Sequence, residues 1–290
     1  MKLLLKFNLV FILVFALGLV ATGYVTWNLL QRNARDETLD RARLLMENAL
    51  AVRKYTQDRV NPLLQTQMKY TFLSESVPGF SAIEVLDTLR QKYADYGYKE
   101  AMLNPTNPRD RAVDWEADII TRFRNASSET ELVGDRATPT GAVLYVARPL
   151  KVGSPACLQC HSTVDAAPKP LVERFGPANG FGWQFNEIVG AQIVSVPTAV
   201  PQARALSAFT AFMQWLTGVI VLIAVALNLM LWLLVIRPVK RLASIAGRVS
   251  LGQFEAPEFS VRGRDEMRDL ADALTRMRKS LVQAMKMLES

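Results

Sequence analysis

The stretch "FMQWLTGVIVLIAVALNLMLWLLVI", residues 212–236, contains no charged residue and lies in an uncharged segment that begins at Ala205. About 20 consecutive apolar residues are enough for an α-helix to cross the hydrocarbon core of a bilayer. Half of the residues in this chain are apolar, and many of them are concentrated in this block and in one other. The segment therefore predicts a membrane-spanning helix over residues 205–236.

The other block, "FNLVFILVFALGLVATGYVTWNLL", occupies residues 7–30. Its length predicts a membrane anchor within residues 1–31. The alternative is a cleaved signal peptide, for which Ala21 and Gly23 offer small residues at a processing spacing. The apolar run extends well past the apolar region of a typical signal peptide, which favours the uncleaved anchor. The sequence thus predicts a two-pass membrane protein.

Basic residues flank both predicted spans on one side. Lys2 and Lys6 precede the first span, and a basic cluster that begins at Arg237 follows the second. Lys and Arg near span ends stay on the cytoplasmic side, so both termini are expected in the cytoplasm of a bacterial inner-membrane protein, with residues 32–204 in the periplasm. The net charge of +7 arises mainly beside the spans, which argues against a nucleic-acid-binding surface.

The pentapeptide "CLQCH", Cys157 to His161, holds both cysteines and the only histidine of the chain. Cys-x-x-Cys-His is the spacing at which haem c is attached, because the two thiols bond to the porphyrin vinyl groups and the adjacent imidazole becomes an axial ligand of the iron. Leu158 and Gln159 act as spacers that set the thiols about one helical turn apart. We predict one covalent haem c per chain, held by Cys157 and Cys160, with His161 as the proximal iron ligand.

Other uses of this motif fit the chain less well. A structural zinc site normally needs four ligands, and the chain has only three Cys and His residues. A thioredoxin-like redox pair leaves the histidine unexplained and needs a βαβ pattern that is not recognisable around it. A simple disulfide is the last alternative. Attachment of haem c takes place outside the bacterial cytoplasm, in agreement with the predicted periplasmic position.

The segment between the predicted spans has the length of one domain. Apolar residues at helical spacing predict a long helix from Asp36 to about Leu73, bent at Pro62, and a shorter helix over Ala82–Tyr93. β-Branched and apolar residues bounded by glycine and proline predict strands over residues 141–150 and 187–197. We therefore expect an α+β domain with helices packed on a small antiparallel sheet.

Three stretches of this domain resemble a known family. They are "LNPTNPRDRAVDWEADIITRF" (103–123), "YVARPLKVGSPACLQCH" (145–161) and "GFGWQFNEIVGAQIVSVP" (180–197). Together they resemble the PAS-like c-type haem sensor domain, a bacterial family formerly of unknown function (DUF3365-like), over most of residues 35–200. The resemblance implies a PAS-like fold and a single haem c with His161 as proximal ligand. It implies no enzymatic activity.

The second axial position of the iron has no obvious ligand. Some relatives supply a cysteine or a further histidine there, and this chain has neither to spare. The remaining candidates are an empty or water-filled position, a lysine, a tyrosine, or one of three methionines, Met46, Met68 and Met102. A vacant position suits a diatomic gas ligand, whereas methionine suits redox sensing or electron transfer. Candidates for contacts with the propionates or the pocket walls are Arg148, Lys151 and Trp183.

Residues 237–290 contain two segments with heptad spacing of apolar residues. The two seams are Val239, Leu242, Ala246 and Val249, then Met267, Leu270, Leu274, Met277, Leu281, Ala284 and Leu288. The connector between them contains the helix breakers Gly252, Pro257 and Gly263. Two short amphipathic helices cannot bury both seams alone, so a dimeric four-helix bundle is expected.

This tail resembles a HAMP signalling module. The resemblance rests on Pro238 after the span, on Gly252 with Phe254, and on the pair Asp265-Glu266 that opens the second helix. It implies two alternative bundle packings that carry a displacement of the span to an output. A simple dimerising coiled coil is the alternative. No output domain is recognisable after the module, so a separate cytoplasmic partner is expected to receive the signal. The alternative is a module that has lost its output and serves as a dimerising anchor.

The predicted protein is a non-enzymatic homodimeric haem c sensor subunit. It detects redox state or a small gas ligand at a periplasmic haem and signals through HAMP to a cytoplasmic protein. The alternative is a membrane-anchored c-type cytochrome that passes electrons to a redox partner. Catalysis at an open iron is disfavoured because no acid–base cluster accompanies the motif. The predicted parts are the first span with the N-terminus, the haem domain, the second span and HAMP, at residues 1–31, 32–204, 205–236 and 237–290.

Overall fold

The computed structural model describes residues 3–253, 255, 257, 259 and 266–288. It divides into two units. One unit consists of Asn28–Ala208, and the other combines the two ends of the chain, Met1–Trp27 and Phe209–Ser290.

The unit 28–208 is built on one four-stranded antiparallel sheet with strand order β1-β4-β3-β2. The strands are β1 (Gly97–Met102), β2 (Leu132–Thr138), β3 (Gly141–Lys151) and β4 (Ile188–Pro197). The two strands predicted from the sequence are confirmed as the central pair, β3 and β4. The edge strands β1 and β2 were not predicted. The α+β class with an antiparallel sheet is confirmed.

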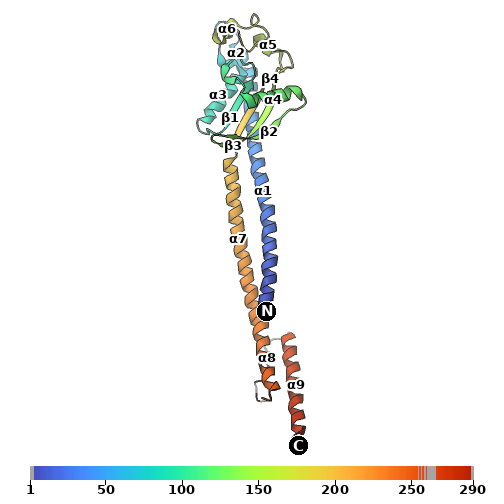
Figure 1. The fold of residues 1–290 in the computed structure, drawn as a ribbon. Coiled ribbons are helices and arrows are strands. Elements are labelled where there is room, and N and C mark those ends of the chain that lie inside the picture. The colour runs from blue at the N-terminus through green and yellow to red at the C-terminus, as the bar shows by residue number, and fades with distance from the viewer. Residues whose placement is uncertain (1–2, 254, 256, 258, 260–265, 289–290) are drawn as a thin grey trace. The chain divides into compact units, whose positions relative to one another are not determined.

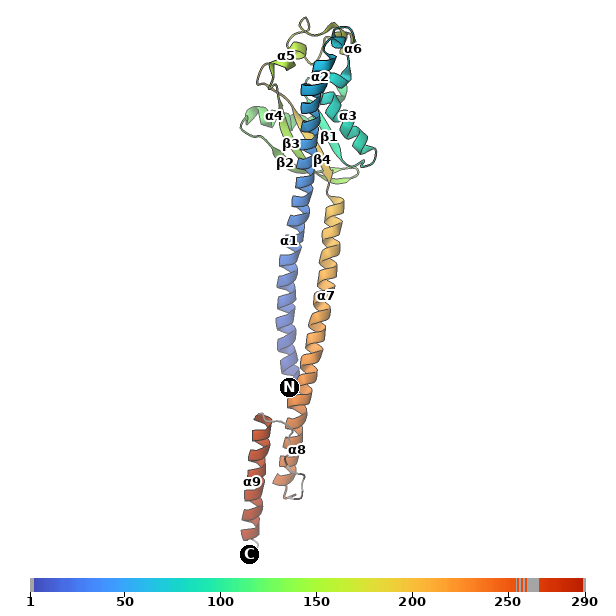
Figure 2. The same ribbon diagram turned by 180° about the vertical axis from the view of Figure 1, so that it is seen from behind.

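Helices cover both faces of this sheet. Helix α4 (Asp114–Asn125) lies across the face seen in Figure 1, whereas α1 (Leu3–Tyr55) and α3 (Pro78–Arg90) lie across the opposite face, seen in Figure 2. Each face has its own apolar core. Met46 of α1 is fully buried in one core and Phe123 of α4 in the other. Burial of such large side chains stabilises the unit, since each contributes about 1.5–3 kcal/mol.

The long helix departs from its predicted course near Pro62. Helix α1 ends at Tyr55, a π-helical turn η1 (Thr56–Val60) follows, and α2 (Asn61–Leu64) ends well before the predicted Leu73. Proline lacks an N–H, and its ring clashes with the carbonyl four residues earlier, so an ordinary α-helix cannot pass through it undisturbed. The N–H of Asn61 bonds instead to the carbonyl of Thr56, five residues back. Two 3₁₀ turns continue the chain, η2 (Gln67–Lys69) and η3 (Ser74–Ser76).

Helix α3 also differs from its prediction, Ala82–Tyr93, because it starts and ends earlier. Pro78 stands in its first turn, where the missing N–H of proline costs nothing. The 3₁₀ turn η4 (Pro108–Asp110) lies beside β1. Figure 1 shows α2, α5 (Pro155–His161) and α6 (Lys169–Phe175) together at the end of the sheet where β1 and β3 finish and β4 begins.

The other unit contains two helices that are long and apolar enough to cross a membrane. They are α1 up to Trp27 and α7 (Ala199–Leu231) from Phe209 onward. The helices run antiparallel, since the Asn228 amide donates to Asn8 Oδ1 at 2.8 Å while Trp27 packs edge-on against Phe209. Within their most apolar windows, at most 6% of the residues are buried, so these surfaces need an apolar surrounding.

After α7, a π-helical turn η5 (Trp232–Ile236) leads into α8 (Arg237–Ser250), and α9 (Glu266–Leu288) follows the connector. Helices α8 and α9 share a small core that contains the predicted Leu242 and Val249 and also Ile245, which lies outside the predicted seam. Phe254 and Asp265 lie outside the described residues. Four seam residues of the single chain are exposed by 39–46%: Val239, Leu270, Met277 and Leu281.

Candidate functional site

The short helix α5 carries the CLQCH motif. Ser154 caps its N-terminus by accepting the Ala156 N–H at 3.2 Å, and Pro155 occupies the first turn. The helix places Cys157 and Cys160 three residues apart, so both thiols lie on the same side of one turn. Both are half-buried free thiols. The predicted helical presentation of the two cysteines is therefore what the structure has.

His161, the last residue of α5, is held by one ring nitrogen. Its Nδ1 lies 2.7 Å from the carbonyl oxygen of Gly180 and 3.5 Å from Thr106 Oγ1. Burial lowers the pKa of His161 below its ordinary value of 6.5, and the bond to Gly180 only partly opposes this shift. A neutral imidazole that donates from Nδ1 to a carbonyl keeps its lone pair on Nε2. Metal-binding histidines are commonly oriented by such a bond.

Trp183 packs against the face of the His161 ring and restricts its rotation. The indole stacks on the imidazole of His161 with ring centroids 3.9 Å apart and planes inclined by 13°. The backbone adds two bonds, from Trp183 N–H to His161 O (3.1 Å) and from Gly182 N–H to Ser162 O (2.9 Å). The structure thus brings the predicted Trp183 into direct contact with His161, and ties the loop 180–183 to the end of α5.

Gly180 and Thr106 were not predicted as site residues with a role. Gly180 has φ +85°, and a Cβ there would lie 2.0 Å from Thr106 Oγ1 and 2.8 Å from Thr106 Cα. Only glycine combines this backbone conformation with so close an approach. The glycines of "GFG" were a signal for a special loop, but its contact with Thr106 joins segments far apart in the chain.

We expect Gly180→Ala to destabilise the protein by about 1–3 kcal/mol, because it adds backbone strain and a clash with Thr106. The displaced carbonyl would also release His161 Nδ1, which imidazole nitrogen shifts in NMR report. Gly176→Ala is the matched control, since Gly176 has φ +78° but no neighbouring atom within 4 Å of the position that a Cβ would take. Equal denaturation midpoints for the two variants would contradict a specific role for the Gly180 contact.

The predicted basic residues lie elsewhere. Arg148 reaches α1, where its guanidinium donates to Glu47 Oε1 at 2.7 Å, and it also binds Glu131 Oε2 at 3.1 Å. Burial alone would lower the pKa of Arg148, but the bonds to Glu47 and Glu131 raise it above its ordinary value. Lys151 is exposed at the end of β3. Arg148 is thus engaged by carboxylates in this structure, and a role toward a propionate stays a prediction.

The three methionines proposed as axial ligands have different surroundings. Met46 is fully buried in the core beneath α1. The sulfur of Met68 accepts two hydrogen bonds of 3.2 Å, from Leu73 N–H and from the Ser76 hydroxyl. Met102 is half-buried at the end of β1. Two of the three thioethers are therefore committed to packing or hydrogen bonds, which makes Met102 the first of them to test.

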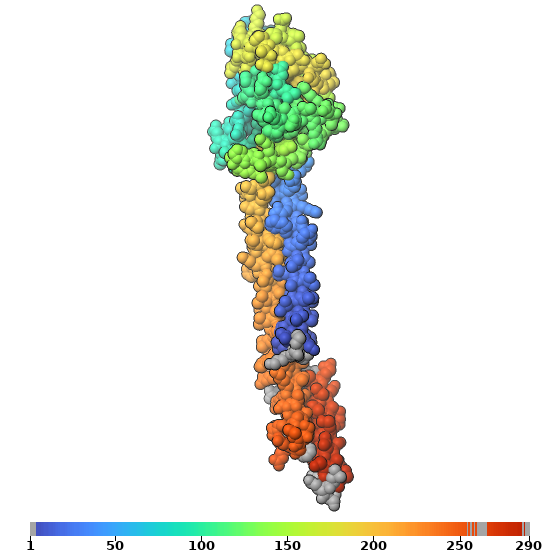
Figure 3. Space-filling view, in the orientation of Figure 1, coloured from blue at the N-terminus to red at the C-terminus, as the bar shows by residue number. Residues whose placement is uncertain are grey.

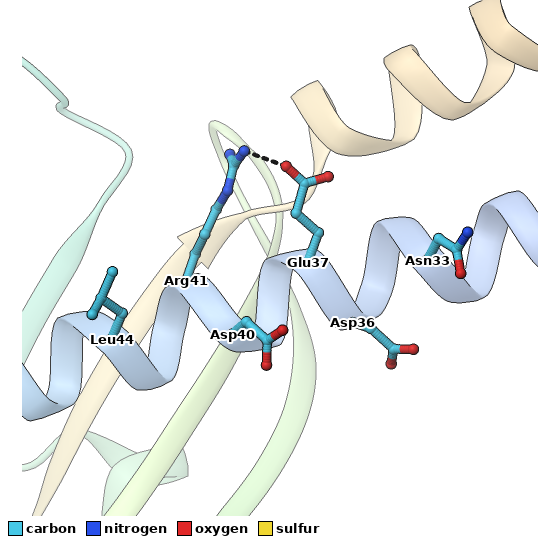
Figure 4. Close-up of a pocket in the computed structure, with 6 residues that line it drawn as sticks. All are labelled: Asn33, Asp36, Glu37, Asp40, Arg41 and Leu44. Atoms are coloured by element: carbon cyan, nitrogen blue, oxygen red, sulfur yellow. Dashed lines mark hydrogen bonds and ion pairs between the residues drawn. The ribbon is translucent and has the colours of Figure 1, made fainter.

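Two hollows on the unit 28–208 contain none of the motif residues. One runs along α1 and is lined by residues of that helix alone, among which Arg41 binds Glu37 (Figure 4). The other, about 320 Å³, lies beside β1 and includes Asp110, whose pKa burial raises to about 6. Neither hollow contains Cys157, Cys160 or His161.

The residues of α5 fit covalent haem. Two half-buried thiols at the required spacing precede an imidazole whose Nδ1 lies at hydrogen-bond distance from the Gly180 carbonyl. Burial lowers the pKa of this imidazole, which favours the neutral ring and a free lone pair on Nε2. Among the described residues, no group of three or more Cys, His, Asp or Glu side chains could hold a bare metal ion. Two thiols and one imidazole on one short helix are the donor set that covalent attachment of a porphyrin requires.

Comparison with known families agrees with this organisation. Residues 31–197 match the family model described as Tll0287-like, which spans more than half of the chain. The chain belongs to the Tll0287-like family. Residues 230–283 of this Tll0287-like protein match the HAMP domain model, so both predicted resemblances are confirmed.

One solved structure similar to this Tll0287-like chain is titled "Crystal structure of the cyanobacterial heme-protein Tll0287". The two share 14% sequence identity with a TM-score of 0.44, and the match covers 56% of this chain and 95% of that chain. No curated protein matches the sequence.

Proposed function

We propose that this protein is a membrane-bound haem c sensor subunit that signals through its HAMP domain. One haem c per chain is attached through Cys157 and Cys160, with His161 as the proximal ligand. The observation that carries the proposal is the hydrogen bond from His161 Nδ1 to Gly180, which leaves Nε2 available as a ligand at the end of the cysteine helix. When bound, haem supplies an iron that changes charge on reduction and can take a diatomic gas.

Few residues separate the loop that holds His161 from the second predicted span. Gly180 and Trp183 hold the imidazole, and the same loop leads into β4. Strand β4 ends at Pro197, and α7 begins at Ala199. A displacement of the ring therefore acts on a strand that is covalently continuous with the second predicted span. We place the PAS-like unit 32–204 in the periplasm and both termini in the cytoplasm, from the basic residues flanking the spans.

We further propose a homodimer formed through HAMP, with a separate cytoplasmic protein as the recipient of the signal. The support is the set of exposed seam residues on α8 and α9, since a monomer leaves Leu270, Met277 and Leu281 more than 40% exposed. Apolar seams of this kind are buried in helical bundles.

Cross-linking tests both parts of the proposal. In haem-loaded chains, Met277→Cys is expected to form dimers with a short bis-maleimide, because Met277 lies on the exposed seam. Lys279→Cys, two residues away on another side of α9, is the control and should react poorly. The yield at position 277 should differ between oxidised and reduced protein. Identical yields in every redox and ligand state would contradict signalling.

An anchored electron-transfer cytochrome is the second candidate, favoured by the position of α5. Figure 3 shows the segment around α5 and α6, in yellow, at the surface of its unit, where a redox partner can approach. Rapid electron exchange together with unchanged cross-linking would support this alternative. A carbon monoxide difference spectrum separates gas sensing from redox sensing, and loss of a sixth ligand in Met102→Leu would identify Met102.

A further inference from the structure

A buried polar network joins α1 to the sheet near the CLQCH end. Arg53 of α1 forms an ion pair with Glu100 of β1, whose side chain is only 2% exposed. The hydroxyl of Tyr98 donates to Glu100 Oε1 at 2.7 Å, and the amide of Gln192 on β4 donates to that hydroxyl at 3.0 Å. The network therefore connects the helix that continues from the first predicted span with the strand that leads to α7.

Arg53 is a charged residue on the otherwise apolar buried face of α1. Ala42, Met46 and Ala49 of α1 are fully buried against the sheet, and Arg53 continues this face one turn later. The π-helical turn η1 begins three residues after Arg53. Such turns are frequent at functional sites. Burying a charged side chain costs free energy unless an opposite charge is paired with it. Arg53 therefore depends on Glu100 at this position.

The sheet register places the network close to the motif. Glu100 pairs with Gln192 and lies two residues before the end of β1. On the other side of β4, Gln192 pairs with Arg148, three residues before the end of β3 at Lys151. A strand rises about 3.3 Å per residue, so the network lies about 10 Å from the sheet end from which the chain runs to α5. Burial alone would lower the pKa of Arg53, but its ion pair with Glu100 raises the pKa above its ordinary value. Arg53 and Glu100 therefore lie close to the end of the sheet from which the chain runs to the motif.

The charge of Glu100 is held firmly in place. The carboxylate of Glu100 contacts Arg53 and Tyr98 and also lies beneath the first turn of α3. A Cβ on Gly79 in that turn would come within 2.7 Å of Glu100 Oε2. The partial positive charge of a helix N-terminus favours a carboxylate there. Burial, reinforced by Glu100, also raises the pKa of Tyr98 above its ordinary value, so the hydroxyl stays a neutral donor.

We propose that Arg53 and Glu100 are positioning residues that set the reduction equilibrium of the attached haem and carry its change of charge to β4. This inference rests on the proposed function. Reduction removes one positive charge from the site, which weakens the repulsion felt by Arg53 and the attraction felt by Glu100. By reciprocity, each of these fixed charges shifts the reduction equilibrium in the opposite direction from the other.

Potentiometric titration of the haem-loaded full chain tests the proposal. Glu100→Gln keeps an oxygen that accepts from Tyr98 and Arg53 but removes the negative charge, so the midpoint potential should rise. We expect about a tenfold change in the reduction equilibrium, which is about 59 mV for a one-electron couple. Arg53→Gln should lower the potential by a similar amount, whereas Arg53→Lys, which keeps the charge, should change it little.

The outcomes separate this inference from the proposed function. A chain that carries no porphyrin overturns the proposed function, and this inference with it. Porphyrin-loaded Glu100→Gln protein with an unchanged or lowered potential overturns the inference alone. Shifts of the same sign in Glu100→Gln and Arg53→Gln would indicate a purely structural role for the pair, and they would also overturn it. If Arg53→Gln folds poorly, the direction of the potential shift in Glu100→Gln alone still tests the inference.

Discussion

Replacing both Cys157 and Cys160 by serine is expected to remove all covalently attached porphyrin from the chain. A thioether needs the cysteine sulfur, and the two thiols of α5 are the only ones in the sequence. After expression in a host competent for cytochrome c maturation, the wild-type chain should carry the mass of one haem and show a Soret band that survives denaturation. The double variant should show neither. Gln159→Ser, an exposed spacer on the same helix, is the matched control and should keep both.

A third variant separates attachment from ligation. His161→Ala leaves both thiols in place but removes the imidazole that Gly180 and Trp183 orient. Porphyrin that is attached in this variant should have an altered spectrum, because the proximal ligand is gone. A wild-type chain without added mass would contradict the haem c proposal, and an unchanged spectrum in His161→Ala would contradict the assignment of the ligand.

The cysteine–histidine motif could be recognised in the sequence because its spacing is local. Five consecutive residues fix the two thiols and the imidazole on one helix turn, whatever the rest of the fold does. The support for His161 is not local, since Gly180 follows 19 residues later and Thr106 precedes it by 55. Contacts between such distant segments follow from the tertiary fold, and no spacing rule in a single sequence reveals them.

The strands show a similar division. The central strands β3 and β4 are covered by helices on both faces, so they are rich in apolar and β-branched residues that are easy to recognise. The edge strands read Gly-Tyr-Lys-Glu-Ala-Met and Leu-Val-Gly-Asp-Arg-Ala-Thr, with charges and glycine that are unfavourable in strands. Edge strands commonly carry charged residues, which discourage pairing with another chain. Their identity as strands therefore came only from the fold.

Arg53 is a residue that the sequence signals only indirectly. Its place in the series Ala42, Met46, Ala49, Arg53 puts a charge on the buried face of a helix, which is a conflict between local pattern and burial. The compensating Glu100 lies in an edge strand that was itself not predicted. Without that strand, the partner of Arg53 could not be named.

Arg53→Met is expected to reduce the free energy of unfolding by about 3–5 kcal/mol, because it leaves the Glu100 carboxylate buried without its cation. Arg148→Met is the matched control. Both arginine side chains are 25% exposed, but Glu100 is 2% exposed, whereas the nearest partner of Arg148, Glu47, is 60% exposed. The second partner of Arg148, Glu131, is 19% exposed and keeps Arg43 as a cation in the variant. A pair with an exposed partner contributes about 0–1 kcal/mol. Denaturant unfolding of the detergent-solubilised full chain without haem measures both variants.

The double variant Arg53→Met/Glu100→Met shows where that cost originates. If an uncompensated buried charge causes the loss, then removing Glu100 as well should restore much of the stability, because apolar side chains can replace a buried ion pair at little cost. If the guanidinium stabilises mainly by packing its aliphatic stem against α1 and the sheet, the double variant stays as unstable as Arg53→Met. Equal losses in Arg53→Met and Arg148→Met would contradict the premise that burial of the carboxylate partner decides the energy. Since stability is compared in the absence of haem, the result bears on the buried pair itself, independently of what α5 binds.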